Sequence, residues 1–204
     1  MAYIVAIIFG YLLGSIPFGF LMGKWKGVDL RKEGSGNIGA TNALRILGKP
    51  AGSAVLALDT LKGALACWLA SGFVNSVPGV ESTALVPIVT GFAAVLGHNY
   101  TCWLRFKGGK GIATSAGVLL ALTPGGLGIS LGTFLLLLAV TRTVSIGSIG
   151  AAAILPFGTW LCGGRGALLV VTAIMGVLAI YKHLANIQRL IAGTEPRIGE
   201  KRAK

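Results

Sequence analysis

Long apolar runs dominate the chain, and short polar loops separate them. Seven apolar segments can be distinguished, and several are as long as a membrane span. A spanning helix needs about 20 apolar residues, because each residue adds about 1.5 Å. The segments cover residues 3–22, 53–72, 84–104, 112–123, 126–141, 146–162 and 166–184. The pattern predicts an all-α, polytopic transmembrane helical bundle that forms one integral-membrane domain over residues 1–204.

The number of spans depends on the fourth and fifth segments. Both are short, and Thr123-Pro124-Gly125-Gly126 joins them. They form either two short spans or one re-entrant hairpin, so the chain has about seven spans or five. The first segment has no basic residue before Lys24 and no clear cleavage site. It therefore indicates a retained span rather than a secretory signal.

Composition agrees with a membrane location. The chain of 204 residues is 54% hydrophobic and 12% charged, with a mean hydropathy of +0.80. Soluble domains carry about 25% charged residues. The three cysteines, Cys67, Cys102 and Cys162, are scattered. Their spacing disfavours a disulfide framework or a metal site.

The distribution of charge predicts the orientation. The net charge is +12, and 16 of the 18 lysines and arginines lie in loops that seven spans place on one side of the membrane. The other two are Lys62, inside the second segment, and Arg165, in an opposite loop. The positive-inside rule then puts the N-terminus outside and the C-terminus in the cytoplasm. Five spans give the same orientation. The basic loops also suit anionic lipid or small anionic substrates, and no nucleic-acid partner is expected.

The first polar cluster is GSGNIGATN at Gly34–Asn42, followed by Arg45. Glycines allow the backbone to turn its N–H groups toward an anion, and a helix beginning near Ala40 would add a positive dipole. Arg45 could contact two phosphate oxygens. These features predict a phosphate site; the alternative is a flexible loop with a helix cap. The other candidate residues are Ser35, Gly36, Asn37, Gly39, Thr41 and Asn42.

The second cluster is Gly97-His98 followed by FKGGKG at Phe106–Gly111. Two lysines next to bare backbone amides suit phosphate, although both could simply extend to the membrane edge. The Walker spacing is absent, so ATP hydrolysis is disfavoured. His98 alone is more typical of a structural histidine. The candidate phosphate-binding residues are Lys107, Gly108, Gly109 and Lys110.

Two further clusters lie at span ends. Arg142, Ser145 and Ser148 are spaced three apart, so on a helix they would face one way, for substrate binding or capping.

The last cluster contains His183 and Asn186, also three apart, with Lys182 before them and Arg189 and Gly193-Thr194-Glu195-Pro196 after them. Polar groups are costly where a span leaves the bilayer unless they are used.

Asp59 and Lys62 inside the second segment are expected to pair. All four clusters lie at predicted cytoplasmic span ends, and they converge on one pocket only if the helices bundle closely.

Together these motifs resemble the bacterial acyl-phosphate:glycerol-3-phosphate acyltransferase family, known as PlsY. The resemblance spans nearly the whole chain in family order, although the loop around Asn75–Thr83 is longer than expected. The matching stretches are GSIPFG at Gly14–Gly19, GSGNIGATN at Gly34–Asn42, GH at Gly97-His98, FKGGKG at Phe106–Gly111 and HxxNIxR at His183–Arg189.

The resemblance implies a seven-span enzyme of the cell inner membrane that faces the cytoplasm and acts in phospholipid synthesis. It implies acyl transfer from acyl phosphate to the 1-hydroxyl of glycerol 3-phosphate, without a cofactor or metal. Ser35, Arg45 and Lys110 would hold phosphate groups, and Lys110 also has a catalytic role in this assignment. Ser148, His183 and Asn186 would line the reacting centre, and Ser145 could exchange roles with Ser148.

The chemistry suits such a site. Acyl phosphate carries a good leaving group, so the enzyme must gather two anions, align a hydroxyl and stabilise an oxyanion. Either His183 or the departing phosphate could accept the hydroxyl proton. Two alternatives remain, a transporter or channel for organic phosphates and a lipid-binding scaffold.

Overall fold

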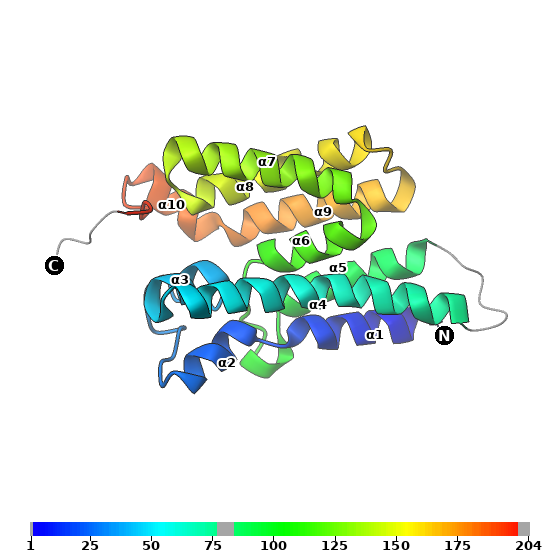
Figure 1. Ribbon diagram of the computed structural model, residues 1–204, viewed down its shortest axis with the longest axis horizontal. Coiled ribbons are helices and arrows are strands. Elements are labelled where there is room, and N and C mark those ends of the chain that lie inside the picture. Colours follow the sequence, from blue (N-terminus) through cyan, green and yellow to red (C-terminus); the bar gives the residue numbers. More distant parts are fainter. Residues whose placement is uncertain (1, 77–83, 200–204) are drawn as a thin grey trace. The chain divides into compact units, whose positions relative to one another are not determined.

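The computed structural model describes residues 2–76 and 84–199. Within these ranges every regular element is a helix, so the all-α prediction is confirmed. The chain divides into two compact units, Met1–Leu122 and Thr123–Lys204 (Figure 1). The single domain expected from the sequence stays a prediction.

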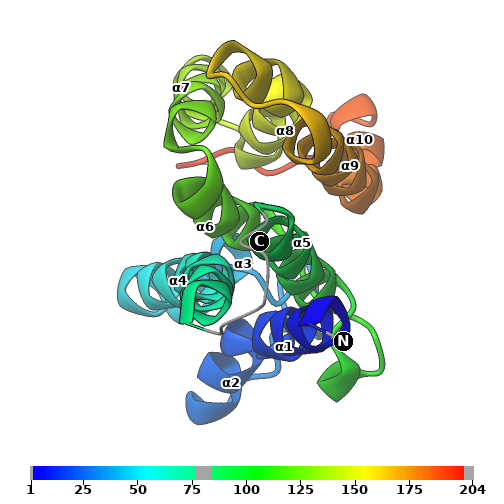
Figure 2. The same cartoon turned by 90° about the vertical axis from the view of Figure 1, so that its right-hand side faces the viewer.

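The first unit contains six α-helices and one 3-10 helix in its described residues. Helix α1 lies beside α5 and α4, and α4 in turn contacts α3, α5 and α6. Figure 2 shows α1, α4 and α5 nearly end-on. The elements are α1 (Ala2–Ser15), α2 (Phe18–Trp25), α3 (Ala40–Leu47), α4 (Lys49–Ser76), α5 (Leu85–Asn99), η1 (Cys102–Leu104) and α6 (Ile112–Leu122). The helix predicted to begin near Ala40 is confirmed. Residues 77–83 of the loop that looked long lie outside the described residues.

Small residues let the helices of this unit approach closely. A Cβ atom added to Gly14 of α1 would collide with the carbonyl oxygen of Ala94 on α5. In the same way, a Cβ on Gly117 of α6 would collide with the carbonyl oxygen of Thr60 on α4. Packing of this kind, rather than a hydrophobic driving force, holds helices together in lipid.

A break at Ile16-Pro17 separates α1 from α2. Proline has no backbone N–H and cannot continue the hydrogen-bond ladder of a helix, so carbonyl groups before it need other donors. The Thr101 hydroxyl donates to the carbonyl of Ser15 at 2.6 Å, and Lys62 Nζ donates to that of Ile16 at 2.8 Å. Side chains from α4 and from the turn after α5 thus fix the kink.

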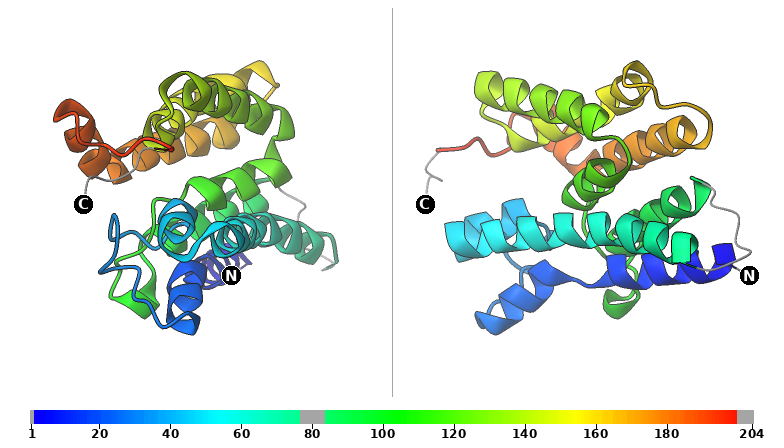
Figure 3. Two further views of the ribbon diagram at one scale, coloured as in Figure 1. Left: turned by 60° about the vertical axis from the view of Figure 1, so that its left-hand side comes forward. Right: turned by 45° about the vertical axis from the view of Figure 1, so that its right-hand side comes forward.

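The second unit is a layer of helices joined by short turns. Helix α8 contacts both α7 and α9, and α10 follows α9 after a bend of 53° (Figure 3). The elements are α7 (Pro124–Thr141), α8 (Val144–Leu161), α9 (Gly166–Lys182) and α10 (Leu184–Ile191).

The helices fit a multi-pass membrane protein. Five helical stretches are long and apolar enough to cross a bilayer, and the bent pair α9–α10 makes up to six. Helix α6 is apolar but has only 11 residues. Helix α7 has 18 residues and is long enough to cross a bilayer without α6. Residues 112–141 therefore need not form one re-entrant hairpin. The five are Tyr3–Trp25, Lys49–Phe73, Leu85–Leu104, Pro124–Thr141 and Val144–Leu161.

Apolar side chains on the outer faces of these helices are highly exposed. Leu136 and Val140 on α7 are 64% and 75% exposed, and Val177 on α9 is 71% exposed. Water-soluble monomers rarely show such extended apolar surface, whereas lipid tails solvate it. The prediction of a polytopic membrane protein is therefore supported by the structure itself.

Candidate functional site

The first predicted phosphate loop connects α2 to α3 and is anchored by a small apolar core. Leu30, Ala43 and Val55 are fully buried together, and Met22 and Ile46 pack against them. These residues come from α2, the loop, α3 and α4. The amphipathic helix α3 therefore seats its apolar face on α4 and holds the end of the loop beside it.

Asn42 organises this loop from within. Its side chain is 2% exposed. Its Oδ1 accepts a hydrogen bond from the Ser35 amide at 3.0 Å. Its Nδ2 donates to the carbonyl groups of Leu30, Glu33 and Asn37 at 3.2, 3.0 and 2.9 Å. The Asn42 amide is thus committed to the loop backbone rather than directed at a ligand.

The loop also uses the amides that the sequence suggested for anion binding. Gly34 and Gly36 have φ values of +62° and +70°, which favour glycine. The Gly36 amide donates to the carbonyl of Glu33 at 3.0 Å, and the Gly39 amide donates to Asn37 Oδ1 at 2.7 Å. Together with the Ser35 amide, these N–H groups shape the loop. We therefore expect side chains rather than these backbone amides to contact phosphate. The side chains of Ser35, Thr41 and Arg45 are exposed.

The neighbouring cation Arg31 is engaged with Asp29. Its Nε and Nη2 atoms donate to the two carboxylate oxygens at 2.9 and 2.8 Å. The hydrogen bond from Arg31 lowers the pKa of the Asp29 carboxyl to about 2. This exposed pair neutralises Arg31 locally. Arg45 lies in the last turn of α3.

The second predicted phosphate loop folds back onto the end of α5. The Gly108 amide donates to the carbonyl of Asn99 at 3.2 Å, and the Gly109 amide donates to that of His98 at 3.0 Å. Arg105 and Phe106 precede these glycines with φ values of +54° and +61°. Such angles are unfavourable for residues with a Cβ and persist only where the surroundings enforce them. The loop conformation is therefore imposed by its contacts.

Buried charges lie beneath this loop. Asp59 and Lys62 on α4 are each 2% exposed and 2.8 Å apart, so their predicted pairing is confirmed. His98 Nδ1 lies 3.5 Å from Asp59 Oδ1. The Asp59 carboxylate therefore faces both Lys62 and His98. The sequence did not suggest that His98 and Asp59 are neighbours, because 38 positions separate them and no spacing rule connects them.

In the second unit, Ser145 and Ser148 lie on the first turns of α8, and each is 4% exposed. The prediction that Arg142 shares their helix face is wrong. Arg142 caps the end of α7 with φ +56°, before α8 begins at Val144. Its Nη2 donates to the carbonyl of Ile198 at 2.9 Å, so Arg142 holds the C-terminal segment.

His183 lies at the bend between α9 and α10 and is 3% exposed. Its Nδ1 is 2.8 Å from the carbonyl oxygen of Ala179. A carbonyl only accepts, so Nδ1 carries the proton and a neutral His183 keeps its lone pair on Nε2. Asn186 follows one turn later and is 6% exposed, as the predicted shared face requires.

The residues after α10 fold back onto it. Gly193, with φ +68°, ends the helix. The Thr194 amide donates to the carbonyl of Arg189, and the Gly193 amide to that of Leu190, which is the Schellman pattern. This turn brings Glu195 between two side chains. Its Oε1 accepts from Asn186 Nδ2 at 2.6 Å, and its Oε2 accepts from Arg189 Nε at 2.7 Å.

Glu195 therefore stays ionised. Partial burial alone would raise its pKa, but hydrogen bonds from Asn186, Ser145 and Arg189 together hold the pKa below its ordinary value. Glu195 thus links Asn186 to Arg189 and was missed as a site residue. The signal for it was its position directly after Gly193-Thr194, where the chain must turn back.

The predicted residues fall into two sets, one in each unit. The first unit holds Ser35–Arg45 and Lys107–Lys110, and the second holds Ser145, Ser148, His183 and Asn186. In the described parts of the chain, no group of three or more His, Cys, Asp or Glu side chains could hold a metal ion. All three cysteines are free thiols.

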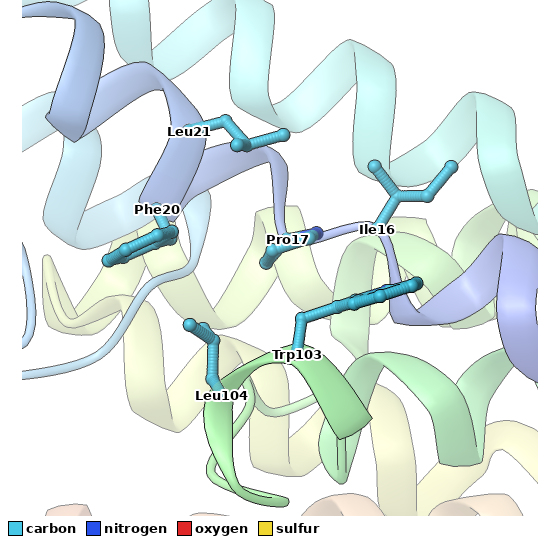
Figure 4. Close-up of a pocket in the computed structure, with 6 residues that line it drawn as sticks. All are labelled: Ile16, Pro17, Phe20, Leu21, Trp103 and Leu104. Carbon is cyan, nitrogen blue, oxygen red and sulfur yellow. The ribbon is translucent and has the colours of Figure 1, made fainter.

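An apolar pocket of about 340 Å³ opens beside the break between α1 and α2 (Figure 4). Pro17 and Phe20 face Leu104 and Trp103 of η1 across it. Among the residues that line this pocket, only Trp103, through its indole N–H, has a side chain that can form a hydrogen bond, and none is charged. Its walls are formed by Ile16, Pro17, Phe20, Leu21, Trp103 and Leu104.

Comparison with known proteins gives full-length matches. Residues 4–193 match the family model described as glycerol-3-phosphate acyltransferase. A protein of that name from Desulforamulus reducens is 46% identical over 200 residues, covering 98% of this chain and 96% of the relative. The crystal structure of PlsY (YgiH), an integral membrane glycerol 3-phosphate acyltransferase in its glycerol 3-phosphate form, is 40% identical. It covers 98% of this chain and 96% of that chain, with a TM-score of 0.89. The lysophosphatidic acid form gives a TM-score of 0.87 at the same identity and coverage.

Proposed function

Since the chain belongs to the glycerol-3-phosphate acyltransferase family and is a membrane acyltransferase, we propose that acyl phosphate is its donor. The acyl group passes to the 1-hydroxyl of sn-glycerol 3-phosphate and gives lysophosphatidic acid and inorganic phosphate, a step of phospholipid synthesis. One observation carries this proposal: the full-length likeness to a solved enzyme in forms named for glycerol 3-phosphate and lysophosphatidic acid.

The first unit supplies the phosphate-binding residues in this proposal. Ser35 and Arg45 are exposed at the α2–α3 loop and α3, and Lys107 is exposed in the glycine loop. A guanidinium can contact two phosphate oxygens, and an ammonium adds a compact charge. Lys110 is half-buried next to the glycines. We assign phosphate binding to Ser35, Arg45, Lys107 and Lys110, while Asn37, Thr41, Asn42 and the glycines shape or extend the loops.

The second unit supplies the reacting centre. The acceptor oxygen attacks the acyl carbonyl carbon, a tetrahedral oxyanion forms, and the bond from carbon to the phosphate oxygen then breaks. A donor aimed at the oxyanion lowers this barrier. The amide of Asn186 is one possible donor, and the Ser148 hydroxyl can also donate. Because the Glu195 carboxylate is anionic and only accepts hydrogen bonds, it holds the Asn186 amide in one orientation.

The hydroxyl proton has two candidate acceptors, His183 Nε2 and the departing phosphate. The bond between His183 and the Ala179 carbonyl favours the tautomer in which Nε2 can accept. A pH–rate profile of His183→Gln distinguishes the two. Loss of the acid limb assigns the proton to His183, and an unchanged shape assigns it to the phosphate.

The apolar pocket suits part of the fatty chain. Acyl phosphate joins an anionic head to a long hydrocarbon tail, and burial of each methylene contributes about 0.8 kcal/mol. The pocket walls are apolar side chains of the α1–α2 break, α2 and η1. η1 also directly precedes the glycine loop, so the pocket lies on the same turn that leads to the phosphate-binding lysines.

We propose that the enzyme lies in the cell inner membrane with its site toward the cytoplasm. The charge distribution of the loops supports this orientation. Single-cysteine variants at Ser35, Lys107 and Gln188, made after replacing the three native cysteines, test it in sealed vesicles of known orientation. A membrane-impermeant thiol reagent should label all three from the cytoplasmic face only. Labelling of any one from the opposite face contradicts the proposal.

The donor and the reaction are tested with purified protein in detergent. Palmitoyl phosphate and palmitoyl coenzyme A are compared as donors, each with and without glycerol 3-phosphate. Lysophosphatidic acid and free phosphate should appear in equal amounts, and only with palmitoyl phosphate plus glycerol 3-phosphate. Lys110→Ala should abolish most of this turnover while the protein still inserts. Activity with palmitoyl coenzyme A alone as donor would overturn the assignment of the donor.

A further inference from the structure

Three buried charged or titratable side chains form a continuous cluster in the first unit, apart from the residues assigned to substrate. Lys62 Nζ lies 2.8 Å from Asp59 Oδ1, and His98 Nδ1 lies 3.5 Å from the same oxygen. These side chains are 2%, 2% and 5% exposed. Lys62 also donates to the carbonyl of Ile16 at the helix break and lies 5.5 Å from the Phe18 ring.

Such a cluster is expensive in a membrane helix. Removing a carboxylate and an ammonium from water costs several kcal/mol per ion, and their attraction repays this only in part. In other proteins, replacing a buried ion pair by apolar residues of similar volume is often neutral or stabilising. The stability of α4 alone therefore does not account for this cluster.

The glycine loop lies directly against this cluster. A Cβ atom on Gly109 would collide with Nε2 of the His98 ring, and one on Gly108 would collide with the His98 carbonyl oxygen. The Gly109 amide donates to that same carbonyl at 3.0 Å. The Nδ1 edge of the imidazole thus faces Asp59, and the Nε2 edge packs against the backbone between Lys107 and Lys110.

We propose that Asp59, Lys62 and His98 form a positioning cluster that fixes the glycine loop for phosphate binding. Lys62 holds the Asp59 carboxylate in place, and the carboxylate orients the His98 ring. The ring in turn fixes the position of the Gly109 backbone that packs against it. This inference rests on the proposed role of Lys107 and Lys110 in phosphate binding. None of the three residues touches substrate; they act through the loop.

The test compares His98→Leu with His98→Asn and with Thr90→Val. Leucine fills the site without a group that can face Asp59, whereas an asparagine amide can still donate to the carboxylate. Thr90 lies on the same helix, is fully buried and donates to the Val86 carbonyl of that helix, so Thr90→Val controls for loss of a buried polar group. Steady-state kinetics are measured for both substrates. Tryptic cleavage is followed at Arg105–Lys110 and at Lys24–Lys32.

His98→Leu should raise the KM for a phosphate substrate about tenfold, with a smaller change in kcat, as expected for one lost charge-assisted contact. Cleavage at Arg105–Lys110 should accelerate by a similar factor, while cleavage at Lys24–Lys32 stays at the wild-type rate. His98→Asn should restore both, and Thr90→Val should match the wild type.

Two results overturn the proposal: wild-type KM and loop cleavage in His98→Leu, or equal acceleration at both cleavage regions, which indicates general loosening. If His98→Leu does not fold, the double variant Asp59→Asn, Lys62→Met removes both buried charges together and must show the same loop-specific effect. Proteolysis does not require turnover, so it decides this inference even if the protein proves inactive with palmitoyl phosphate.

Discussion

Replacing Asn42 by alanine tests whether the first phosphate loop depends on an internal organiser. The buried amide accepts one hydrogen bond from the Ser35 amide and contacts three loop carbonyls. Its two N–H hydrogens are shared among those carbonyls, so at most three full bonds are lost. Each contributes about 1 kcal/mol net. Water can reach the exposed loop and replace part of these hydrogen bonds. We therefore expect the free energy that stabilises the ordered loop to fall by about 2 kcal/mol.

This loss corresponds to an approximately 30-fold smaller ratio of ordered to disordered loop, which lowers the ordered population by up to that factor. The KM of the substrate whose phosphate the loop binds should therefore rise up to about 30-fold. The value of kcat at saturation should change little, since Asn42 does not contact the reacting groups. Steady-state acyl transfer with each substrate varied in turn gives both constants.

Ser71→Ala is the matched control, because the Ser71 hydroxyl donates to the Cys67 carbonyl of its own helix. Thermal unfolding of both variants establishes that they are folded. A folded Asn42→Ala protein with wild-type KM values for both substrates would refute the reasoning. A loss confined to kcat would refute it as well, because it would give Asn42 a chemical role.

Three further predictions concern other parts of the site. Glu195 has a pKa below its ordinary 4.5, so its stabilising contribution is complete above about that pH and is lost as pH falls through the lower folded value. The wild-type melting temperature should drop in that acid range, and Glu195→Gln should melt lower at neutral pH and lack this step; an identical pH dependence contradicts the role of Glu195. Gly109→Ala should abolish most activity because its Cβ would strike the His98 ring, whereas Gly132→Ala on α7 meets open space and should raise stability by up to about 1 kcal/mol; equal activities would contradict the packing. Leu21→Trp should narrow the apolar pocket and shift the preference toward shorter acyl phosphates, measured as kcat/KM against chain length, and an unchanged profile would exclude the pocket as the chain site.

The helical architecture could be predicted because membrane spans are marked by local composition. The apolar run at 53–72 became α4 with little change, and the glycine-to-helix transition at Ala40 was also visible. What the sequence left open was the break at Pro17, since a proline in an apolar run can kink a span or end it. Whether it does so depends on side chains such as Lys62 and Thr101, which satisfy the released carbonyls from distant positions.

The sequence predicts candidate site residues by type and position, but the roles of several of them depend on the folded structure. Polar clusters at span ends are rare enough to stand out, and this pointed to Arg45, Lys110, His183 and Asn186. The commitment of Asn42 to carbonyl groups could not be derived, because it depends on the path of the loop. Arg142 was misplaced for the same reason: three-residue spacing implies a shared face only inside one helix, and Arg142 lies before the helix.

The central claim is a division of labour, in which the loops of the first unit bind phosphate and the residues of the second carry out the transfer. It is tested most directly by measuring the binding of glycerol 3-phosphate and of a non-hydrolysable acyl phosphate analogue calorimetrically to Lys110→Ala and His183→Ala, alongside their turnover. We predict that Lys110→Ala weakens the binding of at least one of the two ligands, whereas His183→Ala binds both like the wild type and loses turnover. Unaltered binding of both ligands by Lys110→Ala, or full turnover by His183→Ala, would contradict the account.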